Sequence, residues 1–294
     1  MDLSILYRGP LSSCNYGCTY CPFAKHTETI AEHLEDEHAL VRFVSWVADH
    51  EDYSISVLFT PWGEALIRKR YQQALVRLTN TSHVRKAAIQ TNLSCNLDWV
   101  DECDKSRLAL WATFHPTEVS RQRFVDKCRE LDRRQVRFSV GAVGLKEHAA
   151  EIEALRRELP SHIYLWINAY KLISDYYNFE DAERFAAIDP QFPINNQNHA
   201  SYGGRCRCGE SVISVYGDGT IRRCHFINEP IGNLYGGKLE SALRERLCSN
   251  STCGCHIGYV HMHDLKLYKI YGDGVLERIP AAYEMRTDNI AVEN

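Results

Sequence analysis

The chain has 294 residues, which suits one large domain or a large domain with a smaller one attached. Its hydrophobic content of 45% suffices for a buried core, and its formal net charge of −4, without a long run of one sign, argues against nucleic-acid or membrane-surface binding that depends on electrostatics. The first residues lack the basic start and long apolar run of a signal peptide, and no apolar stretch approaches the roughly 18 residues of a membrane span, so we expect a cytoplasmic protein whose thiols stay reduced.

The first two thirds of the chain alternate strand-like and helix-like patterns. Short apolar segments rich in Val, Ile and aromatic residues predict buried parallel strands at 3–8, 54–60, 86–91, 108–114, 136–143 and 162–168. Apolar stripes predict helices between them, around 40–47 and 71–78 and over 119–133 and 146–159. Six such units in a row predict an α/β fold with a parallel sheet and outer helices, either an open wound sheet or a partial barrel.

Three cysteines follow the first predicted strand, in the stretch CNYGCTYC at 14–21. In parallel α/β folds the chemistry lies at the carboxyl ends of the strands, where this loop is expected. Three thiols are one short of a structural zinc site, but on a [4Fe–4S] cluster they leave one iron open for a substrate or cofactor. Cys14, Cys18 and Cys21 are therefore candidate cluster ligands, and Tyr20 would place an aromatic edge beside the open iron.

The pattern changes after about residue 195. Residues 194–204 are polar and aperiodic and predict a linker, and 211–224 predicts a hairpin with a Gly-Asp-Gly turn. A second YGDG, at 271–274, predicts another hairpin. Six cysteines fall in one stretch of this region: Cys206, Cys208, Cys224, Cys248, Cys253 and Cys255. Three others stand alone and are expected to be packing residues: Cys95, Cys103 and Cys128.

The C-x3-C-x2-C motif, with an aromatic residue before its last cysteine and a strand before its first, resembles the signature of the radical S-adenosylmethionine (radical SAM) superfamily. The wider opening LYRGPLSSCNYGCTYCPFAK is similar to that of an uncharacterised bacterial family within it. The resemblance implies a partial (β/α)6 barrel over residues 1–197. It also implies that the open iron binds SAM, and that reductive cleavage of SAM gives a 5′-deoxyadenosyl radical that abstracts hydrogen from a substrate.

The same resemblance implies further SAM contacts. In TPWGEAL at 60–66, Gly63 and Glu64 match part of a Gly-Gly-Glu motif that binds the amino group of SAM, and Trp62 replaces the first glycine. The alternative is that Glu64 only opens a helix. Position at or near strand ends suggests Asn92, Ser139 and Val143 as further cofactor-binding residues, although each is as compatible with a local cap or turn.

The tail, with GDGTIRRC followed by IGNLYGG, resembles the twitch domain, a shorter relative of SPASM that carries an auxiliary cluster. The resemblance implies a small cysteine-rich hairpin domain over 198–294 and a second [4Fe–4S] cluster. The expected ligands are Cys206, Cys224, Cys253 and Cys255, with Cys208 able to replace Cys206 and Cys248 a bystander. A zinc site is the alternative, built from Cys253, Cys255, His256, His261 and His263.

The resemblance implies an enzyme of oxidoreductase or transferase type. Its substrate would be a peptide or a small natural-product intermediate, its outcome a net oxidation or rearrangement, and its electron donor a flavodoxin or ferredoxin. No nucleic-acid or membrane partner is expected. Two alternatives stay open: an RNA-modifying radical SAM enzyme, and a non-catalytic metal-binding scaffold with zinc in the tail.

Overall fold

The computed structural model describes residues 1–23, 26–237 and 239–283. Within these ranges the backbone forms a nine-stranded sheet in the order β10-β9-β8-β1-β2-β3-β4-β5-β6 and a separate pair, β11-β7. The strands are β1 (Asp2–Arg8), β2 (Ser54–Phe59), β3 (Val84–Thr91), β4 (Leu108–Phe114), β5 (Arg137–Val143), β6 (Leu165–Asn168), β7 (His199–Ala200), β8 (Val212–Tyr216), β9 (Thr220–Arg222), β10 (Pro230–Asn233) and β11 (Thr252–Cys253). The α-helices are α1 (Ile30–Asp49), α2 (Lys69–Thr79), α3 (Arg121–Arg133), α4 (Ala149–Glu158), α5 (Phe179–Ala186), α6 (Phe192–Asn195), α7 (Leu239–Ala242), α8 (His256–Tyr259) and α9 (Tyr268–Tyr271), and the 3-10 helices are η1 (Asp98–Glu102), η2 (Lys146–His148), η3 (Gly272–Gly274) and η4 (Ala281–Tyr283).

Strands β1 to β6 run parallel and follow one another in chain order, which confirms the expected α/β fold and its six predicted strands. Their register aligns side chains in rows across the sheet. Leu6 pairs with Leu58, and Leu58 pairs with Ala88. Because alternate residues of a strand point to opposite faces, this row faces one side while its sequence neighbours face the other.

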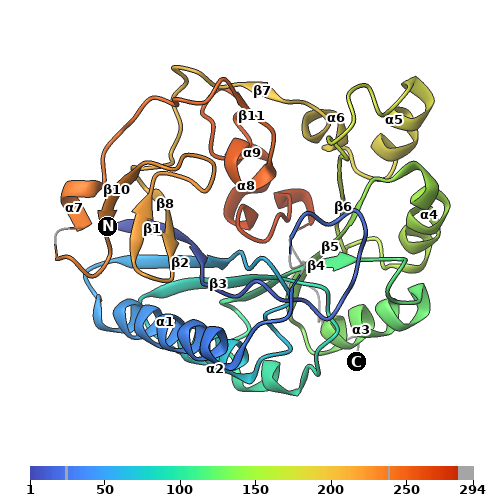
Figure 1. Cartoon of the computed structure of the whole chain (residues 1–294). Helices are drawn as coiled ribbons and strands as arrows, with labels where there is room; N and C mark the ends of the chain where they lie inside the picture. The colour runs from blue at the N-terminus through green and yellow to red at the C-terminus, as the bar shows by residue number, and fades with distance from the viewer. Residues whose placement is uncertain (24–25, 238, 284–294) are drawn as a thin grey trace, which may run out of the picture.

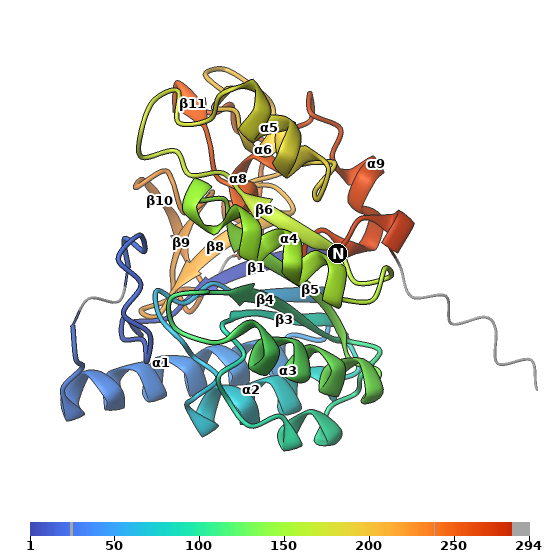
Figure 2. The same cartoon turned by 90° about the vertical axis from the view of Figure 1, so that its right-hand side faces the viewer.

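Each face of the sheet is covered by a different part of the chain. Helices α1, α2 and α3 lie on one face, and α8 and α9 lie on the other (Figures 1 and 2). The second face carries a cluster of its own that joins Leu6, Leu58 and Trp111 to residues such as Tyr271. Tail residues therefore complete the core that the first six strands leave open. None of the helices in the described ranges combines the length and the apolar character that crossing a membrane requires.

The first predicted hairpin is present and the second is not. Strands β8 and β9 pair antiparallel around the Gly-Asp-Gly turn, and β8 also pairs parallel to β1, so the hairpin extends the main sheet. Over 267–279 the prediction is wrong, because the chain forms α9 and η3 there. Leu267, Tyr271 and Val275 are all buried, and their four-residue spacing is that of a helical face rather than a strand. The domain division at 197/198 stays a prediction.

Candidate functional site

One pocket, of about 130 Å³, gathers residues that follow the first four strands. The loop after β1 contributes Cys14, Cys18 and Cys21, and the opposite wall is formed by residues at or just beyond the carboxyl ends of β2, β3 and β4. Those other lining residues include Trp62, Gly63, Glu64, Thr91, Asn92, Thr113 and His115. Parallel strands bring their carboxyl ends to one edge, and this explains why positions so far apart in the sequence share a pocket.

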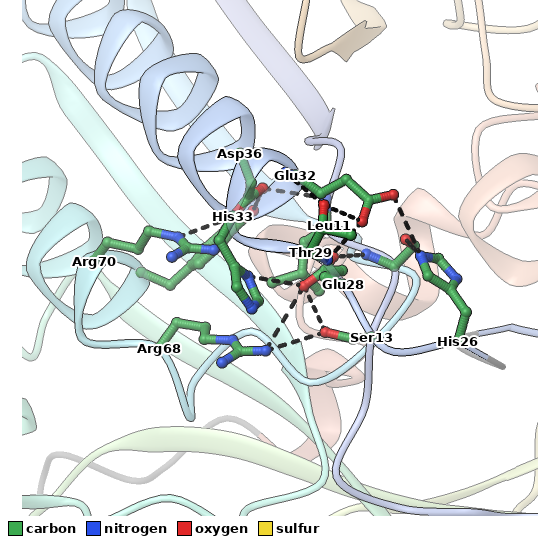
Figure 3. A network of polar contacts seen from close by, with 12 residues as sticks. Leu11, Ser13, His26, Glu28, Thr29, Glu32, His33, Asp36, Arg68 and Arg70 are labelled. Atoms are coloured by element: carbon green, nitrogen blue, oxygen red, sulfur yellow. Dashed lines mark hydrogen bonds and ion pairs between the residues drawn. The ribbon is translucent and has the colours of Figure 1, made fainter.

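A buried polar network anchors the start of the cysteine loop (Figure 3). The Glu28 carboxylate accepts hydrogen bonds from the Ser12 backbone N–H, at 2.7 Å, and from the Ser13 hydroxyl, at 2.6 Å. Nearly two turns into α1, the fully buried Asp36 accepts from the Leu11 backbone N–H and pairs with Arg70 at 2.7 Å. Residues 11–13, directly ahead of Cys14, are thereby held to the first helix.

Gly63 touches the cysteine loop from the other side. A Cβ on Gly63 would lie 1.7 Å from the Ser13 carbonyl oxygen, so no larger residue fits unless backbone moves. The next residue reinforces this contact, because the Glu64 backbone N–H donates to the same carbonyl at 3.2 Å. This close approach gives Gly63 a packing role that is separate from its expected part in SAM binding.

The Glu64 side chain is 2% exposed and faces the end of β3. Its carboxylate accepts from the Thr91 hydroxyl at 2.8 Å, from the Asn92 N–H at 2.5 Å and from the Leu66 N–H at 3.0 Å. Burial raises its pKa to about 7, and these hydrogen bonds oppose the rise. An ionised carboxylate has about four lone-pair sites, so at most one remains for a bound amino group. Its expected contact with SAM stays a prediction.

His115 connects two members of the cysteine loop. Its Nδ1 lies 2.9 Å from the Tyr20 hydroxyl and 3.4 Å from Cys18 Sγ. Burial lowers the pKa of His115 to about 4, so the ring is neutral at physiological pH. Tyr20 is therefore held beside Cys18, the neighbourhood in which the sequence motif predicted it.

The donor set suits an iron–sulfur cluster. Three thiols line one pocket, and burial raises the pKa of Cys14 and Cys18. The Tyr16 backbone N–H already donates to Cys14 Sγ at 3.4 Å, and the Asn92 amide lies 3.9 Å from the same sulfur. Hydrogen bonds of this kind stabilise the thiolates that ligate clusters.

The structure does not bring two predicted cofactor-binding residues to the pocket. The fully buried Ser139 hydroxyl donates to the Glu277 carbonyl at 2.6 Å and accepts from the Trp166 indole at 3.0 Å. It lies near the amino end of β5, so its assignment as a SAM contact finds no support. Val143 ends β5 at the correct edge of the sheet but does not line this pocket.

A second group of thiols lies in the tail, and we refer to it as the tail cluster. Cys206, Cys208, Cys224, Cys248 and Cys253 line one small pocket, together with Arg223. Hydrogen bonding from Cys208 and the charge of Arg223 lower the pKa of Cys206, which favours its thiolate. Cys255 is exposed and does not line this pocket, whereas Cys248 does. Cys248 thus lies with the other thiols of the tail cluster, and the ligand set expected from the sequence stays a prediction.

The zinc alternative finds no matching arrangement. In the part of the chain that the structure describes, no three His, Cys, Asp or Glu side chains are placed to hold a single metal ion. His256 is buried against aromatic rings, and His261 contacts the Tyr268 hydroxyl at 2.9 Å. A four-iron cluster is itself several Å across and separates its ligands further than one ion does, so the tail cluster suits it better.

Sequence reasoning missed the residues that support these sites. Glu28 and Asp36 carry no motif, but Asp36 falls on the same helical face as the apolar Leu40 and Val44, and an acid in that position signals a buried partner. Arg278, buried without hydrogen bonds, was missed as well, and His256, also buried without hydrogen bonds, was considered only for the zinc alternative. The lone cysteines Cys95, Cys103 and Cys128 are buried, as expected of packing residues.

Comparison with solved structures shows a shared fold. The chain is similar to anSMEcpe with bound AdoMet (S-adenosylmethionine), with a TM-score of 0.56 and 14% identity over 82% of this chain and 80% of that one. It is similar to Streptococcus suis SuiB bound to S-adenosylmethionine, with a TM-score of 0.56 and 15% identity over 82% of this chain and 65% of SuiB. A third neighbour is anSMEcpe with bound AdoMet and the Cp18Cys peptide, with a TM-score of 0.55 and 14% identity over 82% of this chain and 79% of that one.

These neighbours were solved with bound S-adenosylmethionine, and at 14–15% identity the likeness shows that this chain shares their fold. No family model matches the sequence, and no curated protein matches it either.

Proposed function

We propose that this chain is a radical SAM enzyme that acts on a peptide or a small natural-product intermediate and carries a second iron–sulfur cluster in its tail. The observation that carries the proposal is the pocket in which Cys14, Cys18 and Cys21 meet Glu64 and Asn92. It occurs in the fold of enzymes that were solved with bound AdoMet. The peptide bound to one neighbour supports a peptide substrate here.

In this proposal Cys14, Cys18 and Cys21 hold a [4Fe–4S] cluster with one open iron. When bound, the cluster and SAM supply one-electron chemistry that generates a 5′-deoxyadenosyl radical. The protein residues position these groups. Gly63 lets the loop after β2 lie against the cysteine loop, and Glu64 fixes the backbone of Asn92 at the pocket wall.

Aromatic side chains at the rim of the pocket would exclude water from it. Trp62 stacks on Phe23 with ring centroids 6.0 Å apart, and the Arg8 guanidinium lies 5.4 Å from the Trp62 ring. Both aromatic residues line the pocket, so they form one apolar side of its entrance. Trp62, which replaces the first glycine of the Gly-Gly-Glu motif, would therefore contribute to this side of the entrance.

For the tail we propose a complete second [4Fe–4S] cluster held by Cys224, Cys248 and Cys253 with either Cys206 or Cys208. A closed cluster has no open iron, so electron transfer is the use that suits it, and a net oxidation of the substrate would follow. The reductant for the first cluster would be a flavodoxin or ferredoxin, and a reducing cytoplasm would keep both sets of thiols available.

The test is iron content together with SAM cleavage in anaerobically reconstituted protein. Two clusters of four irons predict about eight irons per chain. SAM and dithionite should then yield 5′-deoxyadenosine. Cys18→Ala should keep about four irons and lose SAM cleavage, and Cys248→Ala should also fall to about four irons.

Two matched variants serve as controls. Cys255→Ala should keep about eight irons, because Cys255 lies outside the tail cluster. Cys128→Ala removes a thiol buried in α3, away from both groups, and should behave as wild type. Iron lost from Cys255→Ala but not from Cys248→Ala would restore the ligand set expected from the sequence. Absence of both iron and 5′-deoxyadenosine in the wild type would contradict the proposal as a whole.

A further inference from the structure

A buried cation lies among the thiols of the tail cluster. Arg223 is 4% exposed and lines the same pocket as Cys206, Cys208 and Cys253. Its Nη1 donates to the Leu247 carbonyl, but its Nε is buried without a hydrogen-bond partner. Among the residues that the structure describes, no carboxylate forms an ion pair with it. The charge of this guanidinium is therefore held out of water with little to balance it.

The other arginine of the pocket lining is already neutralised. Arg205 also lines the pocket, but its side chain is largely exposed and pairs with Glu245. Within the described ranges, no acidic residue lines the pocket. A guanidinium stays charged at any pH that the protein meets. The thiols of the tail cluster, once ionised, are therefore the groups of this pocket that can balance the charge of Arg223.

The neighbouring arginine shows the contrast. Arg222 ends β9, and its guanidinium lies 4.4 Å from the ring of Tyr216 and donates to Asn228 at 3.0 Å. Arg222 does not line the pocket of the tail cluster, whereas Arg223 does. Adjacent residues of an extended chain point to opposite sides, which explains why two consecutive arginines have such different surroundings.

A structural role alone does not explain why Arg223 is buried. A hydrogen bond to a neutral carbonyl stabilises a fold only modestly, whereas a charge that is taken out of water without a partner is strongly unfavourable. The backbone nevertheless makes room for this residue, because a Cβ on Gly209 would lie 3.0 Å from the Arg223 Cβ. Gly209 has a φ of 91°, a conformation that favours glycine. The fold thus holds Arg223 in a place where a negative partner would remove a penalty.

We propose that Arg223 is the buried counter-ion of the second [4Fe–4S] cluster and raises the reduction potential of that cluster. The inference rests on the proposed function, because it concerns the cluster that we assign to the tail. Four thiolates give such a cluster a net negative charge, and one-electron reduction adds a further negative charge. A fixed positive charge nearby stabilises the reduced form more than the oxidised form. Arg223 therefore biases the second cluster toward accepting an electron.

The test is a redox titration followed by electron paramagnetic resonance, in which the reduced cluster gives the signal. The parent is full-length, anaerobically reconstituted Cys18→Ala protein, because its iron should belong to the tail alone. Arg223→Met in this parent should lower the ratio of reduced to oxidised cluster at a fixed potential by about tenfold or more. For a one-electron couple, a tenfold change corresponds to a shift of about 59 mV. Neither SAM nor substrate is present, so the result does not depend on turnover.

Two further variants separate the charge of Arg223 from its packing. Arg223→Lys keeps the charge, so it should retain most of the reduced fraction that Arg223→Met loses. Arg205→Met is the matched control, because it removes an arginine from the same pocket whose charge Glu245 and solvent already offset. It should keep the potential of the parent. A purely structural Arg223 would instead support iron content and the unfolding midpoint, and its loss would leave the potential of the remaining cluster unchanged.

Three results would overturn the inference. The first is an unchanged potential in Arg223→Met that still holds about four irons, the second is an equal shift in Arg205→Met, and the third is an equal shift in Arg223→Lys. If Arg223→Met holds no iron, Arg223→Gln gives the same decision, because it keeps a donor for the Leu247 carbonyl and lacks the charge. A parent protein without iron would contradict the second cluster itself, whereas iron with an unchanged potential contradicts only the role of Arg223.

Discussion

Removing the charge of Glu277 should destabilise the protein more than most single substitutions. This side chain is fully buried, and one of its oxygens, Oε1, lies 2.7 Å from Lys86 Nζ and 2.6 Å from Arg137 Nε. Asp273 contributes a second carboxylate, 3.0 Å from Lys86 Nζ. The group joins the segment of residues 264–283, which we term the closing segment, to the amino ends of β3 and β5.

The expected loss of stability depends on which oxygen of Glu277 contacts the two cations. Glu277→Gln keeps an oxygen that can occupy the Oε1 position, so the hydrogen-bond geometry survives and only the charge is lost. Breaking a buried ion pair from one side typically costs 3–5 kcal/mol, and because Asp273 still faces Lys86 we expect about 3 kcal/mol. For a chain of this size that corresponds to a fall of about 6 °C in the unfolding midpoint.

The assay is equilibrium unfolding in urea, followed by circular dichroism, with thermal unfolding beside it. Glu277→Leu should cost about 5 kcal/mol, since it removes the carboxylate that Lys86 and Arg137 share and puts no polar group in its place. The double variant Lys86→Met/Glu277→Leu should recover much of that loss, because an apolar pair replaces a buried ion pair at little cost. A loss under about 1 kcal/mol in Glu277→Gln, or a double variant no better than Glu277→Leu, would refute this reasoning.

Two further predictions concern the site and the pH dependence of stability. Gly63→Ala should force the cysteine loop away from the loop after β2 and lower SAM affinity at least tenfold in equilibrium dialysis. The control is Gly17→Ala, because a Cβ on Gly17 would meet nothing nearer than 4.0 Å. Unchanged SAM binding by Gly63→Ala would show that the contact is dispensable. Burial raises the pKa of Asp189 above its ordinary 3.8, so the stability that proton binding contributes is complete below that value and is lost as pH rises through the raised pKa. The free energy of unfolding of the wild type minus that of Asp189→Asn should therefore be larger near pH 4 than at pH 8. A difference that increases toward pH 8 would contradict the assignment.

Local patterns were sufficient to predict the six strands and the cysteine loop. An apolar run such as SISVLF carries its own evidence of a buried strand, and a loop that follows it must lie at the carboxyl edge of a parallel sheet. The motif therefore predicted where Cys14, Cys18 and Cys21 would meet, although their role as ligands stays a prediction.

What local patterns could not predict depends on contacts between distant segments. Cys255 forms a Cys-Gly-Cys pair with Cys253 and so looked the better ligand, whereas Cys248 stands alone in the sequence, yet Cys248 is the one that lines the pocket with the other thiols. The second YGDG was misassigned for a related reason, because Leu267 and Tyr271 are buried against strands that are far away in the chain. Arg278 shows the same limit, since nothing beside it in LERIP indicates two tryptophans from β4 and β6.

The closing segment also has a consequence for biosynthesis. Ribosomes add residues in order, so β1 to β6 are complete long before residues 264–283 are made. Until then Leu6, Leu58 and Trp111 lack the Tyr271 side of their cluster, and this face of the sheet is exposed to other chains. This face of the sheet is therefore the last part of the core to be covered as the chain is made.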